Sequence, residues 1–310
     1  DIPNGEWRHS DFFEIEYKVD NLGAYTVNRI VRTEDQQLYD GLKFVGKNNY
    51  IPTDFSYYNN CKETVLAPAP GSKDAKGVSC FDIHHDDKND PEVIYETEGT
   101  KISYALDRHF KSPRVVTKIR FASTFGYKFK SGFAKLLIHQ ALVLHTLETE
   151  GFYPVSAGLR YEIEVQREGF TEVTIDSFGS KFYDSASFVI SELRHFTVTK
   201  SEFDNVKDTL ARELENWSNR MPYSQAIPVL ERMILTYADL SPELIKSVQA
   251  VTYKQYRNFR TGYFRKLNIE AMVVGNVTHK SAKDLATILD NNLGYDEFGP
   301  ALVPKQQVSI

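Results

Sequence analysis

The chain has 310 residues, a net charge of -5, 41% apolar and 25% charged residues, and a mean hydropathy of -0.41. This composition is typical of a globular protein with room for about two domains of roughly 150 residues, and the negative charge argues against a dedicated nucleic-acid-binding protein. No apolar run approaches the about eighteen residues that cross a membrane, and residues 1–10 are too polar for a signal peptide.

The N-terminal part of the chain predicts an extended arm. Residues 13–17 alternate apolar and acidic side chains, which predicts a short strand. Pro52 keeps Ile51 out of the helical region, so residues 50–55 predict an extended segment that is docked on the rest of the protein.

Residues 59–91 are rich in Pro and Gly, have no apolar period, and predict a linker or surface loop. Cys61 and Cys80 lie in this stretch and can either pair, if the compartment is oxidising, or remain free thiols. Residues 84–87, HHDD, are adjacent potential metal ligands, and adjacent ligands on a loop rarely close a tetrahedral site. We therefore expect no metal there.

Residues 92–295 have a regular pattern that predicts one α+β domain. Short apolar and alternating runs predict six strands, at residues 93–95, 102–106, 115–122, 159–166, 171–177 and 268–277. Apolar residues at helical spacing predict seven helices, at residues 131–150, 181–194, 200–218, 223–235, 242–249, 253–264 and 279–293. The order of these elements predicts a mixed sheet of about six strands covered by helices.

Positive charge is concentrated between Lys101 and Lys130, where eight basic residues and one acidic residue give a local net charge of +7. One interpretation is a pair of strands with solvated basic edges. The other is a wall that attracts acidic partners, with Lys118 and Arg120 on one face of a predicted strand as the substrate-steering residues.

The predicted helix at residues 131–150 is the longest and is apolar on nearly all faces, so we expect it to be buried. Ser131 is its expected N-cap and Gly151 its expected end. Lys135 and His139 interrupt the apolar surface and stand four residues apart on one face.

Residues 253–266 interleave basic and aromatic side chains, a combination that binds single-stranded nucleic acid in other proteins. Helical spacing gives a simpler interpretation, in which the aromatic side chains pack and the basic ones project outward.

Three short phrases are distinctive. Residues 48–55 are NNYIPTDF, residues 156–161 are SAGLRY, and residues 269–278 contain IEA followed by GNVT. In this order they resemble phrases of the insulysin and pitrilysin family of zinc metallopeptidases. The resemblance implies four homologous α+β domains in two halves that close around a peptide-filled chamber. It also implies that only the first domain carries the zinc motif H-x-x-E-H and a distal Glu.

The resemblance implies an identity for each part of the chain. Residues 1–58 would be the tail of the second domain, 59–91 a linker, 92–295 the third and non-catalytic domain, and 296–310 a linker to the fourth. The implied partners are peptide substrates and the other domains of the same chain, with neither nucleic acid nor membrane. The sequence of a fragment does not show where the full-length protein is located in the cell. A cytoplasmic location is the default expectation.

The residues themselves allow a test of the non-catalytic assignment. In a catalytic copy of this helix, His would stand at positions 135 and 139 and Glu at position 138, to bind zinc and accept a proton from its water. This chain has Lys135, Ile138 and His139, and Glu213, 74 residues after His139, is similar to the distal ligand. An ammonium at position 135 opposes a dication, so we expect no catalytic residue and no zinc in this segment, and zinc in the full-length enzyme.

Other interpretations of the same residues remain open. His139 can be a hydrogen-bonded core histidine, and Glu213 can simply face solvent. For the whole chain, the first hypothesis is a non-catalytic domain in the wall of the chamber, and the alternative is a stand-alone scaffold or binding module with the same fold and no protease activity.

Overall fold

The computed structural model describes residues 7–10, 15–18, 46–56, 91–107, 110, 112–127, 131–166, 169–219, 221–234 and 241–297. These residues belong to two units, residues 1–47 and 48–310. Cys61, Cys80 and residues 84–87 lie outside the described residues. The boundaries predicted at 58/59 and 91/92 fall in or beside the undescribed residues 57–90, and the predicted linker at 296–310 is described only to residue 297, so they stay predictions.

The described residues of the first unit form an antiparallel pair of strands. β1 (Trp7–Ser10) pairs with β2 (Ile15–Lys18), with Trp7 opposite Lys18 and Ser10 opposite Ile15. The strand predicted at residues 13–17 overlaps β2, whose partner β1 was not predicted.

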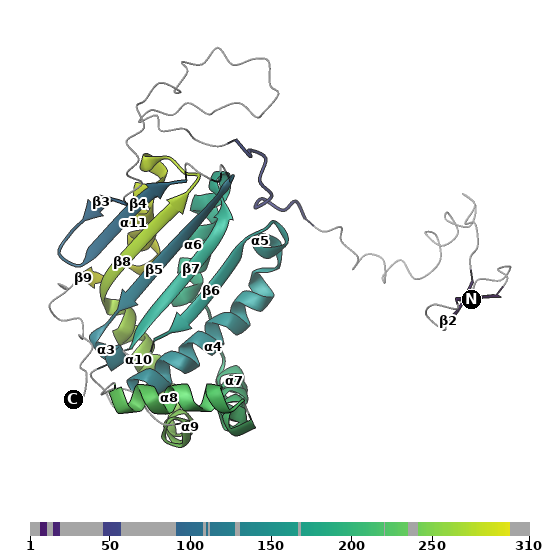
Figure 1. Cartoon of the computed structure of the whole chain (residues 1–310), viewed down its shortest axis with the longest axis vertical. Coiled ribbons are helices and arrows are strands. Elements are labelled where there is room, and N and C mark those ends of the chain that lie inside the picture. Colours follow the sequence, from purple (N-terminus) through teal and green to yellow (C-terminus); the bar gives the residue numbers. More distant parts are fainter. Residues whose placement is uncertain are drawn as a thin grey trace, which may run out of the picture. The chain divides into compact units, whose positions relative to one another are not determined.

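A mixed sheet organises the second unit and confirms the predicted α+β fold (Figure 1). Its six main strands follow the spatial order β3-β4-β8-β5-β7-β6, and the short β9 pairs with the start of β8. β4 and β8 are parallel, whereas the other neighbours on this path are antiparallel. The strands are β3 (Glu92–Glu96), β4 (Thr100–Leu106), β5 (Arg114–Ala122), β6 (Arg160–Val165), β7 (Phe170–Phe178), β8 (Lys266–Gly275) and β9 (Asp296–Glu297).

The described helices agree with the seven that were predicted, to within a few residues at each end. They are α4 (Gly132–Glu150), α6 (Phe182–His195), α7 (Lys200–Glu215), α8 (Pro222–Ile234), α9 (Ser241–Ala250), α10 (Tyr253–Arg265) and α11 (His279–Leu293). Two short helices, α3 (Thr124–Tyr127) and α5 (Phe152–Ser156), were not predicted. Four and five residues are too few to show a helical period.

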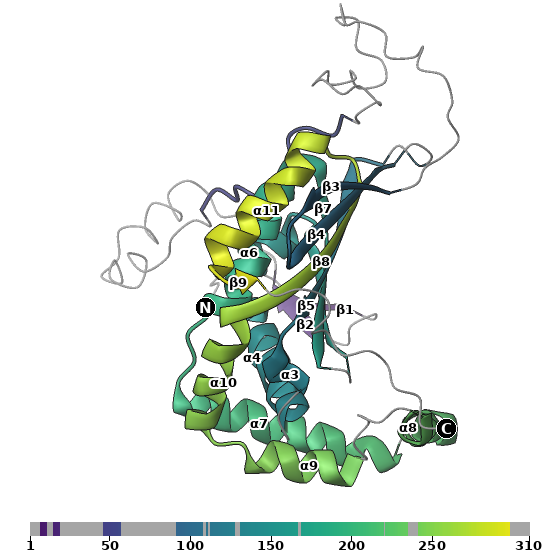
Figure 2. The ribbon, with the colours of Figure 1, turned by 90° about the vertical axis from the view of Figure 1, so that its left-hand side faces the viewer.

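The helices lie unequally about the sheet. Figure 2 shows α6 and α11 against one face of the sheet, while no described helix lies over the opposite face. α8 projects on the side of that uncovered face (Figure 2). On β5 the side chains of Val115, Ile119 and Phe121 are at most 1% exposed, whereas Val116 and Lys118 between them are exposed. Because strand side chains alternate, the buried set faces the helices and the exposed set faces the open side.

α4 is buried, as its apolar pattern predicted. Leu136, Ile138 and Leu142 are at most 1% exposed. Ser131 is the N-cap residue and Gly151 the C-cap residue, as predicted, but Ser131 adopts a left-handed conformation with φ 69 and its side chain makes no capping hydrogen bond. Its carbonyl accepts the first helical hydrogen bond from Lys135 N at 3.1 Å, and Gly151 N–H donates to Leu147 O at the other end.

Among the helices of the described segments, none is both long enough and apolar enough to span a lipid bilayer.

Candidate functional site

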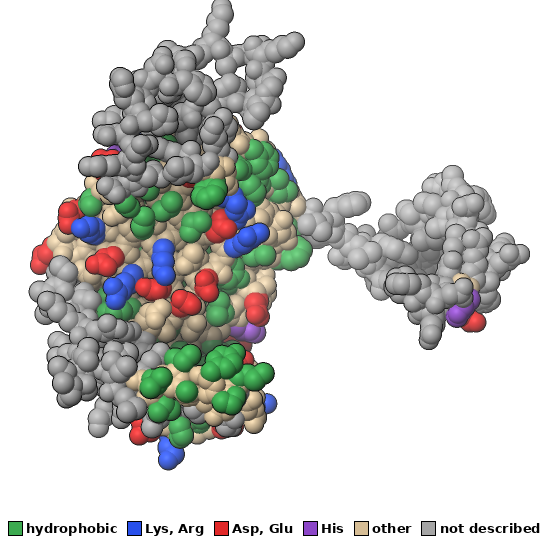
Figure 3. Space-filling view, viewed as in Figure 1, with side chains coloured by type: hydrophobic (Ala, Val, Ile, Leu, Met, Phe, Trp, Pro, Cys, Tyr) green, Lys and Arg blue, Asp and Glu red, His purple; other side chains and the backbone are tan. Residues whose placement is uncertain are grey.

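The uncovered face of the sheet carries interspersed positive and negative side chains (Figure 3). Arg120 on β5 lies opposite Glu172 on β7 and opposite Glu270 on β8, so one strand's cation stands between two carboxylates. Its guanidinium is 3.7 Å from Glu270 Oε2 and lies over the Phe170 ring at 3.9 Å. Lys118 Nζ lies 3.1 Å from Glu172 Oε2.

Part of the positive charge counted along residues 101–130 is therefore paired in space, because the four basic residues of this segment that the structure describes all lie near carboxylates. Five basic residues of this face each lie within 4.0 Å of a carboxylate of Glu96, Glu172, Asp176 or Glu270: Lys101, Arg114, Lys118, Arg120 and Arg160. The exposed pairs among these, such as Lys101 with Glu96, contribute little to stability, but all of the pairs reduce the field that a charged ligand meets. Substrate steering by Lys118 and Arg120 stays a prediction.

The three positions of α4 that correspond to the zinc motif lie in different surroundings. Lys135 is half-buried, and its ammonium is 5.8 Å from the centroid of the Phe259 ring. Ile138 is fully buried in the core. His139 is 2% exposed, and its Nδ1 lies 3.0 Å from the hydroxyl of Tyr256 on α10.

The imidazole of His139 is enclosed by aromatic rings. The ring centroids of Phe196 and Phe264 lie 5.7 Å and 5.3 Å away. Burial, together with the positive charge of Arg260, lowers the pKa of His139 from 6.5 to about 3, so the ring is neutral at pH 7. Its Nε2 is buried and has no hydrogen-bond partner.

Glu213 lies on α7 and is exposed. It lines a groove of about 420 Å³ between α4 and α7 that does not include His139, whereas His145 and Glu148 of α4 do line it. The described segments hold no group of three or more His, Cys, Asp or Glu side chains that could bind a metal ion. The absence of a zinc site in the whole chain stays a prediction.

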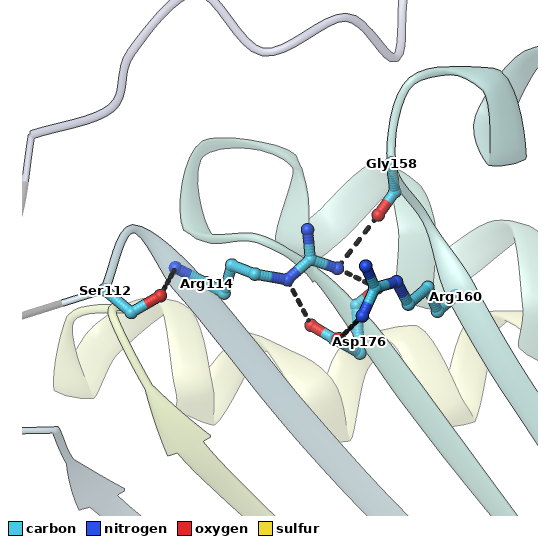
Figure 4. A network of polar contacts seen from close by, with 5 residues as sticks. All are labelled: Ser112, Arg114, Gly158, Arg160 and Asp176. Carbon is cyan, nitrogen blue, oxygen red and sulfur yellow. Dashed lines mark hydrogen bonds and ion pairs between the residues drawn. The ribbon is translucent and has the colours of Figure 1, made fainter. Parts of the chain in front are cut away.

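The three distinctive phrases meet at one end of the sheet, around Arg114. Its Nε donates to Asp176 Oδ1 at 2.7 Å, and one terminal nitrogen donates to Gly158 O at 2.9 Å and to Asp176 O at 3.2 Å (Figure 4). Gly158 belongs to the phrase at residues 156–161 and has φ +96, and a Cβ there would lie 2.9 Å from Phe178. This turn therefore requires glycine.

The other two phrases complete the same cluster. Asn276 N donates to Arg114 O at 2.8 Å, and its side chain donates to Ser56 O at 2.7 Å. Phe55 packs edge-on against Phe178 with centroids 5.4 Å apart. Asn48 at the start of this segment donates to the carbonyl of Tyr153, at 2.7 Å. The predicted docking of residues 50–55 on the sheet domain is thereby confirmed.

Comparison with known proteins identifies the family. Residues 3–246 match the model of the middle or third domain of the M16 peptidases. The chain therefore belongs to the M16 peptidase family, and what was a resemblance in three phrases is shown over most of its length.

Individual relatives agree with this assignment. The chain is 22% identical over 283 residues to insulin-degrading enzyme of Drosophila melanogaster, covering 91% of this chain and 26% of that protein. It is 21% identical over 301 residues to the Homo sapiens enzyme, covering 97% and 27%. The crystal structure of pitrilysin has the same fold, with a TM-score of 0.68 and 16% identity over 95% of this chain and 29% of that one. The chain thus spans about a quarter of the length of these relatives.

The hydrogen bonds around Arg114 predict that this residue stabilises the fold much more than the neighbouring Arg160 does. Replacing Arg114 by Met removes hydrogen bonds to a half-buried carboxylate and to the Gly158 carbonyl, and we expect the free energy of unfolding to fall by about 2 kcal/mol. Arg160→Met is the control, because Arg160 is 79% exposed and 4.0 Å from Asp176, so its loss costs less than about 0.5 kcal/mol. Urea unfolding of both variants measures the difference, and equal losses would contradict the role given to Arg114.

The buried His139 predicts a pH-dependent stability. Below pH 6.5 the unfolded chain binds a proton at this residue that the folded protein excludes down to about pH 3. Stability therefore falls as pH decreases through this window, by up to about 1.4 kcal/mol per pH unit from this residue. Urea unfolding between pH 7 and pH 5 should show a shallower decrease for His139→Gln than for the unchanged protein. His145→Gln, at an exposed position, should leave the decrease unchanged; identical pH profiles for all three proteins would refute the assignment.

Proposed function

We propose that this chain is a non-catalytic domain of an insulysin-like zinc metalloendopeptidase and forms part of the wall of a chamber that encloses peptides. The supporting observation is α4, which presents Lys135 and Ile138 where a catalytic copy would present a zinc-binding His and a general-base Glu. The match of residues 3–246 to the middle or third domain of the M16 peptidases supports the assignment to a peptidase. The zinc of the full-length protein would then be held by another domain.

The surroundings of His139 support the same proposal. Aromatic rings rather than carboxylates surround its imidazole. A zinc site needs three or four ligands that share the metal, and the described segments place no group of three or more His, Cys, Asp or Glu side chains where they could do so. The neighbourhood of His139 therefore offers no partners for a zinc ion.

The uncovered sheet face supports the role as a wall. Described helices cover the other face of the sheet, so this face is open (Figure 2). It carries many charged side chains and can remain in contact with water (Figure 3). Such a surface can line a water-filled space. The alternative is a stand-alone scaffold or binding module, which the same fold would also support.

Two proteins compared side by side test this proposal: the 310-residue chain and the full-length protein that contains it. We expect the chain to be metal-free and inactive on peptides, and the full-length protein to hold about one zinc per chain and to cleave them. Metal analysis and a fluorogenic peptide assay measure both properties. Stoichiometric zinc and cleavage by the chain itself would contradict the proposal, whereas a full-length protein without either would favour the scaffold.

Substrate steering is tested by reversing charge on the open face. If Lys118 and Arg120 attract acidic peptides, Lys118→Glu with Arg120→Glu in the full-length enzyme should lower kcat/KM for acidic peptides several-fold relative to basic ones at low salt. Lys280→Glu with Lys283→Glu on α11 is the control, because it makes the same charge change at exposed positions of the helix on the opposite side. An unchanged preference in the first variant would exclude steering.

A further inference from the structure

α8 turns its large apolar side chains toward solvent. Tyr223, Ile227 and Leu230 are 69%, 53% and 55% exposed, and their spacing places them along one face of the helix. Ser224 and Gln225 are half-buried instead. The helix thus has the reverse of the usual arrangement, in which the apolar face packs inward.

The exposed residues at the start of α8 form an uncharged run. Met221 and Val229 are also exposed, by 65% and 43%, and no Asp, Glu, Lys or Arg occurs between residues 221 and 230, before Glu231 and Arg232. Together these side chains expose on the order of 500 Å² of apolar surface, which is near the largest patch that a monomeric protein usually leaves uncovered. Surfaces of this kind mark a binding site.

The location of α8 relates this surface to the open sheet. α8 stands on the side of the sheet's uncovered face, beyond the plane of the strands (Figure 2). In the space-filling view, which has the orientation of Figure 1, apolar side chains gather over α8, below the charged face (Figure 3). Under the proposed function, both surfaces face the enclosed peptide.

The size of the patch distinguishes among occupants. A stable complex of two folded proteins buries about 800 Å² on each partner, so α8 alone cannot hold a second copy. Its thirteen residues span about 20 Å, the length of roughly six residues of extended peptide. Alternate side chains of such a peptide point to one face, so about three of them can contact the helix together.

We propose that α8 binds the large apolar side chains of unfolded peptide segments. Folded proteins bury such side chains, so this surface selects chains that have not folded. The proposal rests on the proposed function, because it needs the open side of the sheet to face peptide. It adds a substrate preference for Leu, Ile, Phe or similar residues at a distance from the bond that is cleaved.

Photo-crosslinking in the full-length protein identifies what covers α8. A benzophenone-bearing phenylalanine replaces Ile227, or Phe152 on α5 as a control at another exposed apolar position. A fluorescent ten-residue peptide with Leu at alternate positions is the probe, and its Ser-substituted form is the comparison. We expect crosslinking of the Leu peptide at position 227, and little with the Ser peptide or from position 152.

Crosslinked products other than the one with the Leu peptide would contradict the proposal and would show what covers α8 instead. Mass spectrometry of the product shows whether position 227 has joined the peptide, another part of the same chain, or a second copy. Crosslinks confined to the same chain mean that another domain covers α8, and crosslinked dimers mean that a second copy does. Equal crosslinking of the Leu peptide and the Ser peptide would show that α8 does not select apolar side chains.

Peptide affinity provides a readout that is independent of catalysis. Replacing Tyr223, Ile227 and Leu230 together by Ser should raise the Kd of the Leu peptide about tenfold, measured by fluorescence anisotropy with zinc chelated, and leave the Ser peptide unchanged. These side chains are exposed, so the melting temperature should stay the same. A protein that binds the Leu peptide through α8 but cleaves nothing would retain this inference and reject the proposed function. An unchanged Kd would reject the inference alone.

Discussion

The hydrogen bonds of Arg114 hold together the end of the sheet on which the rest of this domain depends. Its guanidinium joins β5 to the carboxylate of Asp176 on β7 and to the carbonyl of Gly158, just before β6. A planar fork with several fixed donors can satisfy a carboxylate and two carbonyls at once, which a lysine could not. The backbone of the same residue accepts a hydrogen bond from Asn276, which follows β8. One residue thereby connects four consecutive strands of the sheet.

This cluster gives a physical reason for the phrases that reveal the family. Gly158 and Gly275 have φ +96 and +130, and a Cβ at Gly275 would lie 2.5 Å from the carbonyl oxygen of Arg114. Asn276 connects β8 to Ser56, at the end of the extended segment that precedes the domain. These phrases attach a preceding segment to the sheet. They identify the fold and its docking and do not include positions 135, 138 and 139, so the family could be recognised without the positions that correspond to the zinc motif.

α4 shows how burial changes the chemistry available to a residue. His139 in water would titrate near neutral pH, but its enclosed position favours the neutral ring and lowers its pKa to about 3. The sequence predicted a buried helix and allowed a hydrogen-bonded core histidine at this position. Its partner, Tyr256, lies 117 residues away on α10 and could not be found from a local pattern. The separation of Glu213 from His139 likewise depends on how α7 lies against α4.

Local patterns in the sequence determined the main strands and helices of this protein, because the period of apolar residues is set by the geometry of each element alone. The start of α7 is likewise local, since Thr199 and Glu202, three residues apart, exchange hydrogen bonds in a capping box. Only the tertiary structure decided which charges meet. Lys118 and Arg120 of the +7 segment lie beside Glu172 and Glu270, because β5 lies between β7 and β8, whose sequences come some 50 and 150 residues later. The exposure of the apolar face of α8 was also invisible in the sequence, since an amphipathic period shows that a face is apolar but not what covers it.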